Sequence, residues 1–258
     1  LEIHDNSAFM GCASWLTKPL PKNGVIKDLW KSEEAKEIRK SVTDGSYRFC
    51  DKTLCPYLSE LLSFNRTQVG PVKHISQVSD KIKDYIATGE DKFNNGPSII
   101  QMSFDRTCNY KCPSCRVDMI VASSEKIKTV NLTIDEIEDA YSNSIETIYC
   151  SGTADPFASV SYRNFLKNFN PKKYPKLKSI HLHTNASLWD KEMWDSMPNI
   201  HKYVSSCEIS IDAATQNTYE NVTRLGGNWD NLLKNLRFIS TIKSIKTVKC
   251  SFVVQQSN

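Results

Sequence analysis

Short apolar runs and amphipathic segments alternate along the chain from Ser98 onward. Five apolar runs have the length and composition of strands, at 98–104, 146–150, 179–183, 207–211 and 247–254. The segments at 160–169, 190–196, 215–222 and 229–242 predict helices, and residues 133–136 have the form of a capping box that opens another helix. Strands that alternate with helices predict a parallel sheet with right-handed crossovers. We therefore expect an α/β fold in the form of a partial (β/α) barrel.

The first part of the chain lacks this alternation of apolar runs and amphipathic segments. Residues 1–64 predict a small irregular module, in which a helix at 32–43 is the clearest element because Ser32 can cap it and Gly45 follows its end. Residues 65–97 are polar and mixed, with one short helix expected at 76–87. The pattern thus predicts an N-terminal module at 1–64, a linker at 65–97 and a core domain at 98–258.

Composition and charge exclude few classes of protein. Hydrophobic residues make up 40% and charged residues 24% of the 258 residues, as in an ordinary globular chain. The net charge of +4 gives no argument for binding to nucleic acid or to a membrane. No apolar run approaches the ~20 residues of a membrane span. The first residues lack the basic and apolar regions of a signal peptide, so we expect a cytoplasmic protein.

The cysteines carry the strongest chemical signal. There are nine, and an odd number that falls in tight groups fits metal ligands better than a disulfide framework. Cys108, Cys112 and Cys115 follow the first strand of the expected core with the spacing C-x3-C-x2-C. Three thiolates on one loop can bind three irons of a cubane and leave the fourth iron open. A zinc site is the alternative, although no His or Cys at a short fixed spacing completes a four-ligand set.

This loop resembles the signature of the radical S-adenosylmethionine (SAM) superfamily. The resemblance implies that Cys108, Cys112 and Cys115 hold a [4Fe–4S] cluster whose open iron binds the amino and carboxylate groups of SAM. In that family, reduction of the cluster splits SAM and releases a 5′-deoxyadenosyl radical. The match covers about 98–258, because further motifs follow the later strands in order.

The resemblance also assigns residues to SAM binding. The stretch after the second strand looks like the glycine-rich segment that receives the SAM ammonium group, with Asp155 as its carboxylate. Ser210 and Asp212 lie on one face by strand alternation and could contact the ribose. Arg224 looks like the arginine that reaches the SAM carboxylate, which a planar fork can bind bidentately. The full implied set is Ser151, Gly152, Thr153, Asp155, Thr184, Asn185, Ser210, Asp212 and Arg224.

Several of these residues also have plainer interpretations. The stretch at 151–156 could be an ordinary strand-to-helix turn, and Arg224 could be a solvated surface residue. His181 and His183 lie at i and i+2 on one strand and could be metal ligands or a proton source beside the substrate, but we expect hydrogen-bonded sheet residues there. Three further cysteines lie in expected strands and predict buried thiols: Cys150, Cys207 and Cys250.

A second cysteine group lies in the N-terminal module. Cys12, Cys50 and Cys55, with the surrounding sequence, resemble a SPASM or twitch module, which implies an auxiliary Fe–S cluster; a structural zinc site is the alternative. A [4Fe–4S] cluster without an open iron requires four thiolate ligands. We therefore expect the natural protein to extend upstream and to supply a fourth ligand there, with His4 as the alternative ligand. We also expect the core to continue beyond Asn258 with a further strand.

The resemblance implies an enzyme that abstracts hydrogen from an unidentified substrate, such as a peptide, a protein or another bulky molecule. Its implied partners are that substrate and a reductant such as flavodoxin or ferredoxin, with no membrane partner and no evidence for nucleic acid. Two classes remain as alternatives: a non-catalytic Zn- or Fe–S-binding interaction protein, which would have no SAM affinity, and an electron-transfer protein, whose core cluster would be fully ligated.

Overall fold

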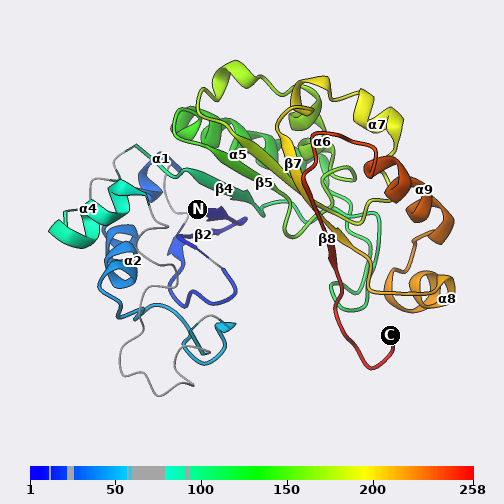
Figure 1. The fold of residues 1–258 in the computed structure, drawn as a ribbon, viewed down its shortest axis with the longest axis horizontal. Helices are drawn as coiled ribbons and strands as arrows, with labels where there is room; N and C mark the ends of the chain where they lie inside the picture. Colours follow the sequence, from blue (N-terminus) through cyan, green and yellow to red (C-terminus); the bar gives the residue numbers. More distant parts are fainter. Residues whose placement is uncertain (12, 22–25, 57, 60–78, 91–92, 94) are drawn as a thin grey trace. The chain divides into compact units, whose positions relative to one another are not determined.

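The computed structural model describes residues 1–11, 13–21, 26–56, 58–59, 79–90, 93 and 95–258. The chain divides into two compact units (Figure 1). The N-terminal unit comprises Leu1–Pro97 with Asp139–Tyr141, and the C-terminal unit comprises Ser98–Glu138 and Ser142–Asn258. The main division falls between Pro97 and Ser98, at the residue where the alternating pattern of the sequence begins.

Five parallel strands form the sheet of the C-terminal unit. They are β4 (Ile99–Met102), β5 (Thr147–Cys150), β6 (Ser179–Thr184), β7 (Val204–Ser210) and β8 (Thr247–Ser251). Their order in the sheet follows the chain, with each strand paired to the next. Among the described residues β8 pairs with β7 alone, so the sheet is open and not a closed barrel. The predicted α/β class with a parallel sheet is confirmed.

Helices connect these strands, and most begin with a side-chain cap. Their bounds are α5 (Ser124–Tyr141), α6 (Val160–Lys167), α7 (Lys191–Asp195), α8 (Gln216–Thr218) and α9 (Trp229–Ile239). Short turns of 3-10 helix lie at Pro171–Lys173 and Pro198–Ile200, and a π-helical turn, Tyr219–Thr223, follows α8. Ser159 shows the common arrangement, because its hydroxyl accepts a hydrogen bond from Tyr162 N at 3.1 Å. Within the described ranges, no helix has both the length and the apolar content needed to cross a membrane.

The two faces of this sheet differ in polarity. Ile100, Ile148 and Leu182 are each at most 2% exposed and lie on the face that the helices cover. Side chains of α5 and α6, including Ile137 and Phe165, pack against this face, and Figure 1 shows these helices alongside the strands. The alternate positions carry polar side chains, because successive residues of a strand point to opposite faces. The hydrophobic core therefore lies between sheet and helices and leaves the other face polar.

Two expectations about this unit are wrong. The capping box at Thr133 does not open a helix, because α5 already begins at Ser124, where the hydroxyl of Ser123 accepts from Lys126 N at 3.1 Å. Thr133 is buried in the middle of α5. Cys150 and Cys207 are buried as expected, but Cys250 is exposed because β8 forms the edge of the sheet.

In its described residues, the N-terminal unit contains three short antiparallel strands and three helices. The strands are β1 (Glu2–Ile3), β2 (Ser7–Phe9) and β3 (Leu20–Pro21), and the helices are α1 (Ile26–Leu29), α2 (Glu33–Thr43) and α4 (Asp80–Thr88). The predicted helix after Ser32 is confirmed as α2, and Ser32 caps it by accepting from Ala35 N at 3.1 Å. The helix expected at 76–87 corresponds to α4, although residues 76–78 lie outside the described residues.

The first prediction tests the core between the sheet and the helices. Leu182 lies in the central strand β6 and is 0% exposed, whereas Leu132 on α5 is 63% exposed. Leu182→Ala should lower the free energy of unfolding by about 2–5 kcal/mol, because it leaves a cavity in a packed core. Leu132→Ala, the matched control, should change it by less than about 1 kcal/mol. Urea unfolding measures both, and equal losses would contradict this assignment of the core.

Candidate functional site

The loop that follows β4 carries the three core cysteines and is anchored at both ends. Cys108 N donates to Ile120 O at 3.0 Å, which closes the loop on itself. Tyr110 is 1% exposed, and its hydroxyl lies 3.3 Å from the hydroxyl of Tyr219. Burial raises the pKa of both phenols, so they stay protonated and pair as neutral groups. The cysteine loop is thus fixed to the π-helical turn that precedes Arg224.

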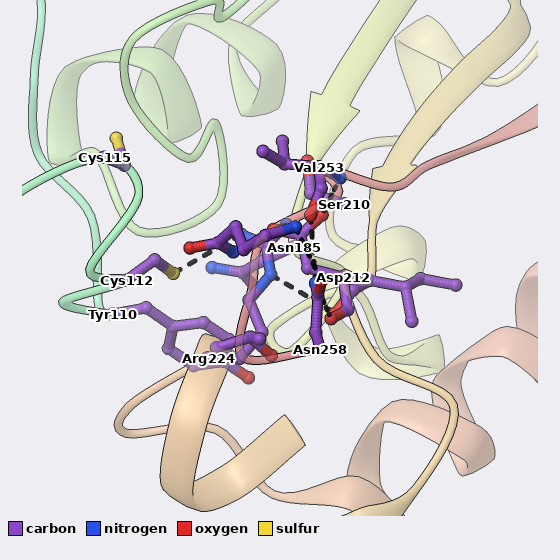
Figure 2. Close-up of polar contacts among 12 residues, drawn as sticks. Tyr110, Cys112, Cys115, Asn185, Ser210, Asp212, Arg224, Val253 and Asn258 are labelled. Atoms are coloured by element: carbon purple, nitrogen blue, oxygen red, sulfur yellow. Dashed lines mark hydrogen bonds and ion pairs between the residues drawn. The ribbon is translucent and has the colours of Figure 1, made fainter. Parts of the chain in front are cut away.

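Each of the three thiols accepts a hydrogen bond from a different nitrogen. The sulfur of Cys108 lies 3.8 Å from Asn185 Nδ2, and burial with the nearby Asp155 carboxylate raises the pKa of this thiol. The sulfur of Cys112 lies 3.4 Å from Arg224 Nη1. Figure 2 shows the sulfurs of Cys112 and Cys115 pointing in different directions. Among the described residues, no three His, Cys, Asp or Glu side chains converge closely enough to hold a metal ion.

The chemistry of the donor set nevertheless fits an iron–sulfur cluster. None of the three sulfurs is in a disulfide, and all three line the same cavity. They come from one loop at the carboxyl end of a strand, and thiolates are the usual ligands of such clusters. Side-chain rotation of Cys115, which is exposed, changes the direction of its sulfur without moving the backbone. Cys108, Cys112 and Cys115 are therefore the residues that would hold the cluster.

The cavity beside these cysteines lies where the parallel strands end. It measures about 230 Å³. Every residue that the resemblance assigns to SAM binding lines it except Ser151, which lines a neighbouring cavity. The strand-end residues that line it are Gly152, Thr153, Asp155, Thr184, Asn185, Ser210, Asp212, Ser251 and Val253, joined by Arg224. Residues far apart in the sequence are thus brought together because parallel strands end at one edge of the sheet.

Gly152 packs closely against the side chains of Gln101 and Ser103. A β-carbon there would lie 2.8 Å from Ser103 Oγ and 2.9 Å from Gln101 Nε2, which is closer than non-bonded atoms approach. The preceding residue, Ser151, has a positive φ of 77° and its hydroxyl donates to Ala154 O. The segment therefore lies close to β4, and Gly152 lines the cavity. The alternative of an ordinary strand-to-helix turn therefore stays open.

The carboxylate of Asp155 is buried and fully hydrogen bonded. It is 1% exposed. Its Oδ1 accepts from the backbone nitrogens of Phe157 and Ala158, at 3.0 and 3.1 Å. Its Oδ2 accepts from Thr184 Oγ1 at 2.7 Å and from Asn185 N at 2.9 Å. A carboxylate has about four acceptor positions, so Asp155 joins the loop after β5 to the end of β6. The ammonium contact that the resemblance assigns to it stays a prediction, which requires one of these donors to give way.

Arg224 is a buried cation that binds Asp212. Its Nη2 lies 2.7 Å from Asp212 Oδ2, and their side chains are 10% and 2% exposed. The alternative of a solvated surface arginine is therefore wrong. Asp212 is held in turn by Val253 N, which donates to Oδ1 at 2.7 Å (Figure 2). Arg224 thus connects Asp212, which follows β7, to the sulfur of Cys112, and the carboxylate of Asp212 balances its charge.

Arg116 is a site residue that the sequence analysis missed. It directly follows the last cysteine, and its guanidinium donates to Arg106 O at 2.7 Å, to Thr153 O at 2.9 Å and to Cys115 Sγ at 3.3 Å. It also lines the cavity. The signal in the sequence was an arginine beside a candidate thiolate ligand, where an N–H···S contact can tune a cluster.

The two histidines of β6 are hydrogen-bonded sheet residues, as the sequence predicted. His181 Nδ1 lies 2.8 Å from Ser206 Oγ, and His183 Nε2 lies 3.0 Å from Ser210 Oγ. Burial lowers the pKa of both imidazoles, so both are neutral near pH 7.

Two cysteines of the N-terminal unit belong to a small apolar cluster. Cys55 is buried with Tyr47 and Leu58, and Trp15 and Cys50 pack against them. Cys12, the third member of the predicted group, lies outside the described residues. The auxiliary cluster expected from Cys12, Cys50 and Cys55 therefore stays a prediction, as does the alternative of zinc.

No protein-family model matches the chain, and no curated protein matches its sequence. The residues of the site and their arrangement are therefore the basis for a function.

The second prediction tests the positioning role of Asp155. Asp155→Asn replaces one acceptor oxygen with a donor and leaves two buried donors unpaired. The free energy of unfolding should fall by about 1–3 kcal/mol. Asp118→Asn, the same change at an exposed position, should alter it by less than about 0.5 kcal/mol. Urea unfolding of both variants measures this, and an unaltered Asp155→Asn protein would show that the four hydrogen bonds do not hold the site together.

Proposed function

We propose that this chain is a radical SAM enzyme, with a [4Fe–4S] cluster on Cys108, Cys112 and Cys115 and SAM in the adjoining cavity. One observation carries the proposal. The three cysteines and the later motifs, which the sequence connects only through resemblance, line a single cavity at the ends of five parallel strands. An open parallel sheet with helices on one face is the α/β arrangement that a partial barrel of this type requires.

The bound cofactors would supply reductive cleavage of SAM and a carbon radical that abstracts hydrogen from an unreactive C–H bond. The protein supplies position and charge. Arg224 offers its guanidinium to the carboxylate of SAM, while Asp212 keeps that guanidinium aimed at the cavity. Asp155 fixes the loop after β5 so that the backbone around Gly152 lies close to the ligand. Asn185 and Arg116 donate to the cysteine sulfurs and orient the ligands of the cluster.

The N-terminal unit would hold an auxiliary Fe–S cluster through Cys12, Cys50 and Cys55. A reductant such as flavodoxin or ferredoxin would deliver the electron, in the cytoplasm. On the resemblance alone, the substrate is a peptide, a protein or another bulky molecule; the side chains of the sheet favour a smaller substrate, which is argued below.

The third prediction is that the reconstituted chain cleaves SAM. Anaerobic reconstitution with iron and sulfide, followed by dithionite and SAM, should yield 5′-deoxyadenosine and methionine in equal amounts, measured by liquid chromatography with mass spectrometry. The Cys108→Ala, Cys112→Ala, Cys115→Ala triple variant should yield none, because the cluster has lost its ligands. Protein that carries a full complement of iron but neither binds nor cleaves SAM would contradict the proposal and favour a non-catalytic or electron-transfer protein.

Arg224 provides a sharper test of the SAM site. Arg224→Lys keeps the positive charge beside Asp212, so the buried carboxylate stays paired, but it removes the bidentate fork. The dissociation constant for SAM should rise about tenfold in equilibrium binding, the loss expected for one charge-assisted hydrogen bond. Arg237→Lys on the exposed face of α9 is the matched control and should leave it unchanged. Equal affinities in all three proteins would remove Arg224 from the SAM site.

A further inference from the structure

A second cavity lies on the polar face of the sheet and belongs to none of the motifs above. It measures about 430 Å³. Side chains from all five strands line it, at Gln101, Tyr149, Ser151, His181, His183, Ser206, Glu208, Thr247 and Lys249. All these side chains contain polar groups, whereas the opposite face of the same strands is apolar. A polar surface of this breadth on the open face of a sheet is suited to a polar ligand.

The strand register arranges these side chains in two rows. The first row crosses the whole sheet, since its members are successive pairing partners on β4 to β8: Gln101, Tyr149, His181, Ser206 and Thr247. The second row lies one step nearer to the carboxyl ends and contains His183, Glu208 and Lys249. Because neighbouring strands lie ~4.8 Å apart, the second row places an imidazole, a carboxylate and an ammonium side by side.

This cavity adjoins the SAM cavity along the strands. His183 lines both cavities. On β7 Glu208 lines the larger cavity and Ser210 the SAM cavity, and on β8 the same holds for Lys249 and Ser251. Two residues of a strand span ~6.6 Å. A ligand on the second row would therefore lie next to SAM bound in the first cavity.

Glu208 and Lys249 are opposite charges that do not bind each other. They are direct partners in the β7–β8 register, yet among the described residues neither makes an ion pair or a side-chain hydrogen bond. Glu208 is half-buried and Lys249 is exposed. An ion pair at such a position would contribute ~0–1 kcal/mol, so little is lost when a ligand binds each group separately. The adjacent imidazoles are neutral, because burial lowers their pKa, and the lining has no net charge.

We infer that this second cavity binds a free α-amino acid, with its ammonium group at Glu208 and its carboxylate at Lys249. The inference rests on the proposed function, for which it names the class of substrate. An α-amino acid carries an ammonium and a carboxylate on one carbon, and Glu208 and Lys249 offer one opposite charge to each from adjacent strands. Its side chain would then lie over the first row, where Tyr149 offers an aromatic ring that is 36% exposed and Gln101 offers an amide.

The fifth prediction tests this binding with the full chain. Each of the twenty standard L-amino acids is titrated singly and observed by saturation-transfer NMR, with dissociation constants from calorimetry for those that bind. At least one should bind, and its N-acetyl amide, which lacks both charges, should bind at least about tenfold more weakly. Glu208→Gln and Lys249→Met should each weaken the amino acid about tenfold. Glu192→Gln and Lys234→Met make the same changes on exposed helix positions and should have no effect.

Binding of no amino acid, equal binding of the N-acetyl amide, or full affinity in both cavity variants would overturn the inference. Binding of D-glucose in place of amino acids would also overturn it, because the cavity would then recognise an uncharged polar ligand. Lys249 is exposed, so Lys249→Met retains the fold and keeps the test decisive if Glu208→Gln does not fold. The SAM cleavage assay on the unaltered chain is separate: cleavage without amino-acid binding refutes this inference alone, and amino-acid binding without cleavage refutes the radical SAM proposal alone.

Discussion

Parallel pairing of five strands is the constraint on which the rest of this structure depends. Because every strand of the C-terminal unit runs in the same direction, every strand delivers its carboxyl end to one edge. The cysteine loop after β4 and the polar segments after β5, β6 and β7 therefore meet, although up to about half of the chain separates them. The same pairing fixes the register, and the register decides which polar side chains are neighbours on the open face.

Buried charges keep this edge in one arrangement. Asp155 uses four hydrogen bonds to join two strand ends, and Asp212 holds Arg224 at 2.7 Å inside the protein. Removal of one partner would leave an uncompensated charge in a place that water does not reach, which is far more costly than the pair itself is stabilising. These carboxylates act by positioning other groups. Because these carboxylates are buried, they bind groups of the protein, although carboxylates also suit ligand binding.

Much of the sheet and of the candidate site could be predicted from the sequence. All five strands could be predicted because apolar runs of that length alternate with amphipathic segments, and the cysteine spacing is visible without a structure. The start of α5 could not, because Ser123 and Thr133 are both capable caps and only the fold buries Thr133. The exposure of Cys250 depends on β8 being an edge strand, which is a property of the whole sheet. The second cavity depends on cross-strand register, since Glu208 and Lys249 become neighbours only through pairing.

We propose above that the three-cysteine loop holds a cluster with an open iron beside a SAM cavity. Electron paramagnetic resonance of the anaerobically reconstituted and reduced chain, recorded without and with SAM, tests this directly. We expect a [4Fe–4S]⁺ signal whose shape changes when SAM is added, because SAM binds the iron that lacks a protein ligand. A [4Fe–4S]⁺ signal that SAM leaves unaltered would show that four ligands close the cluster and would refute the open iron.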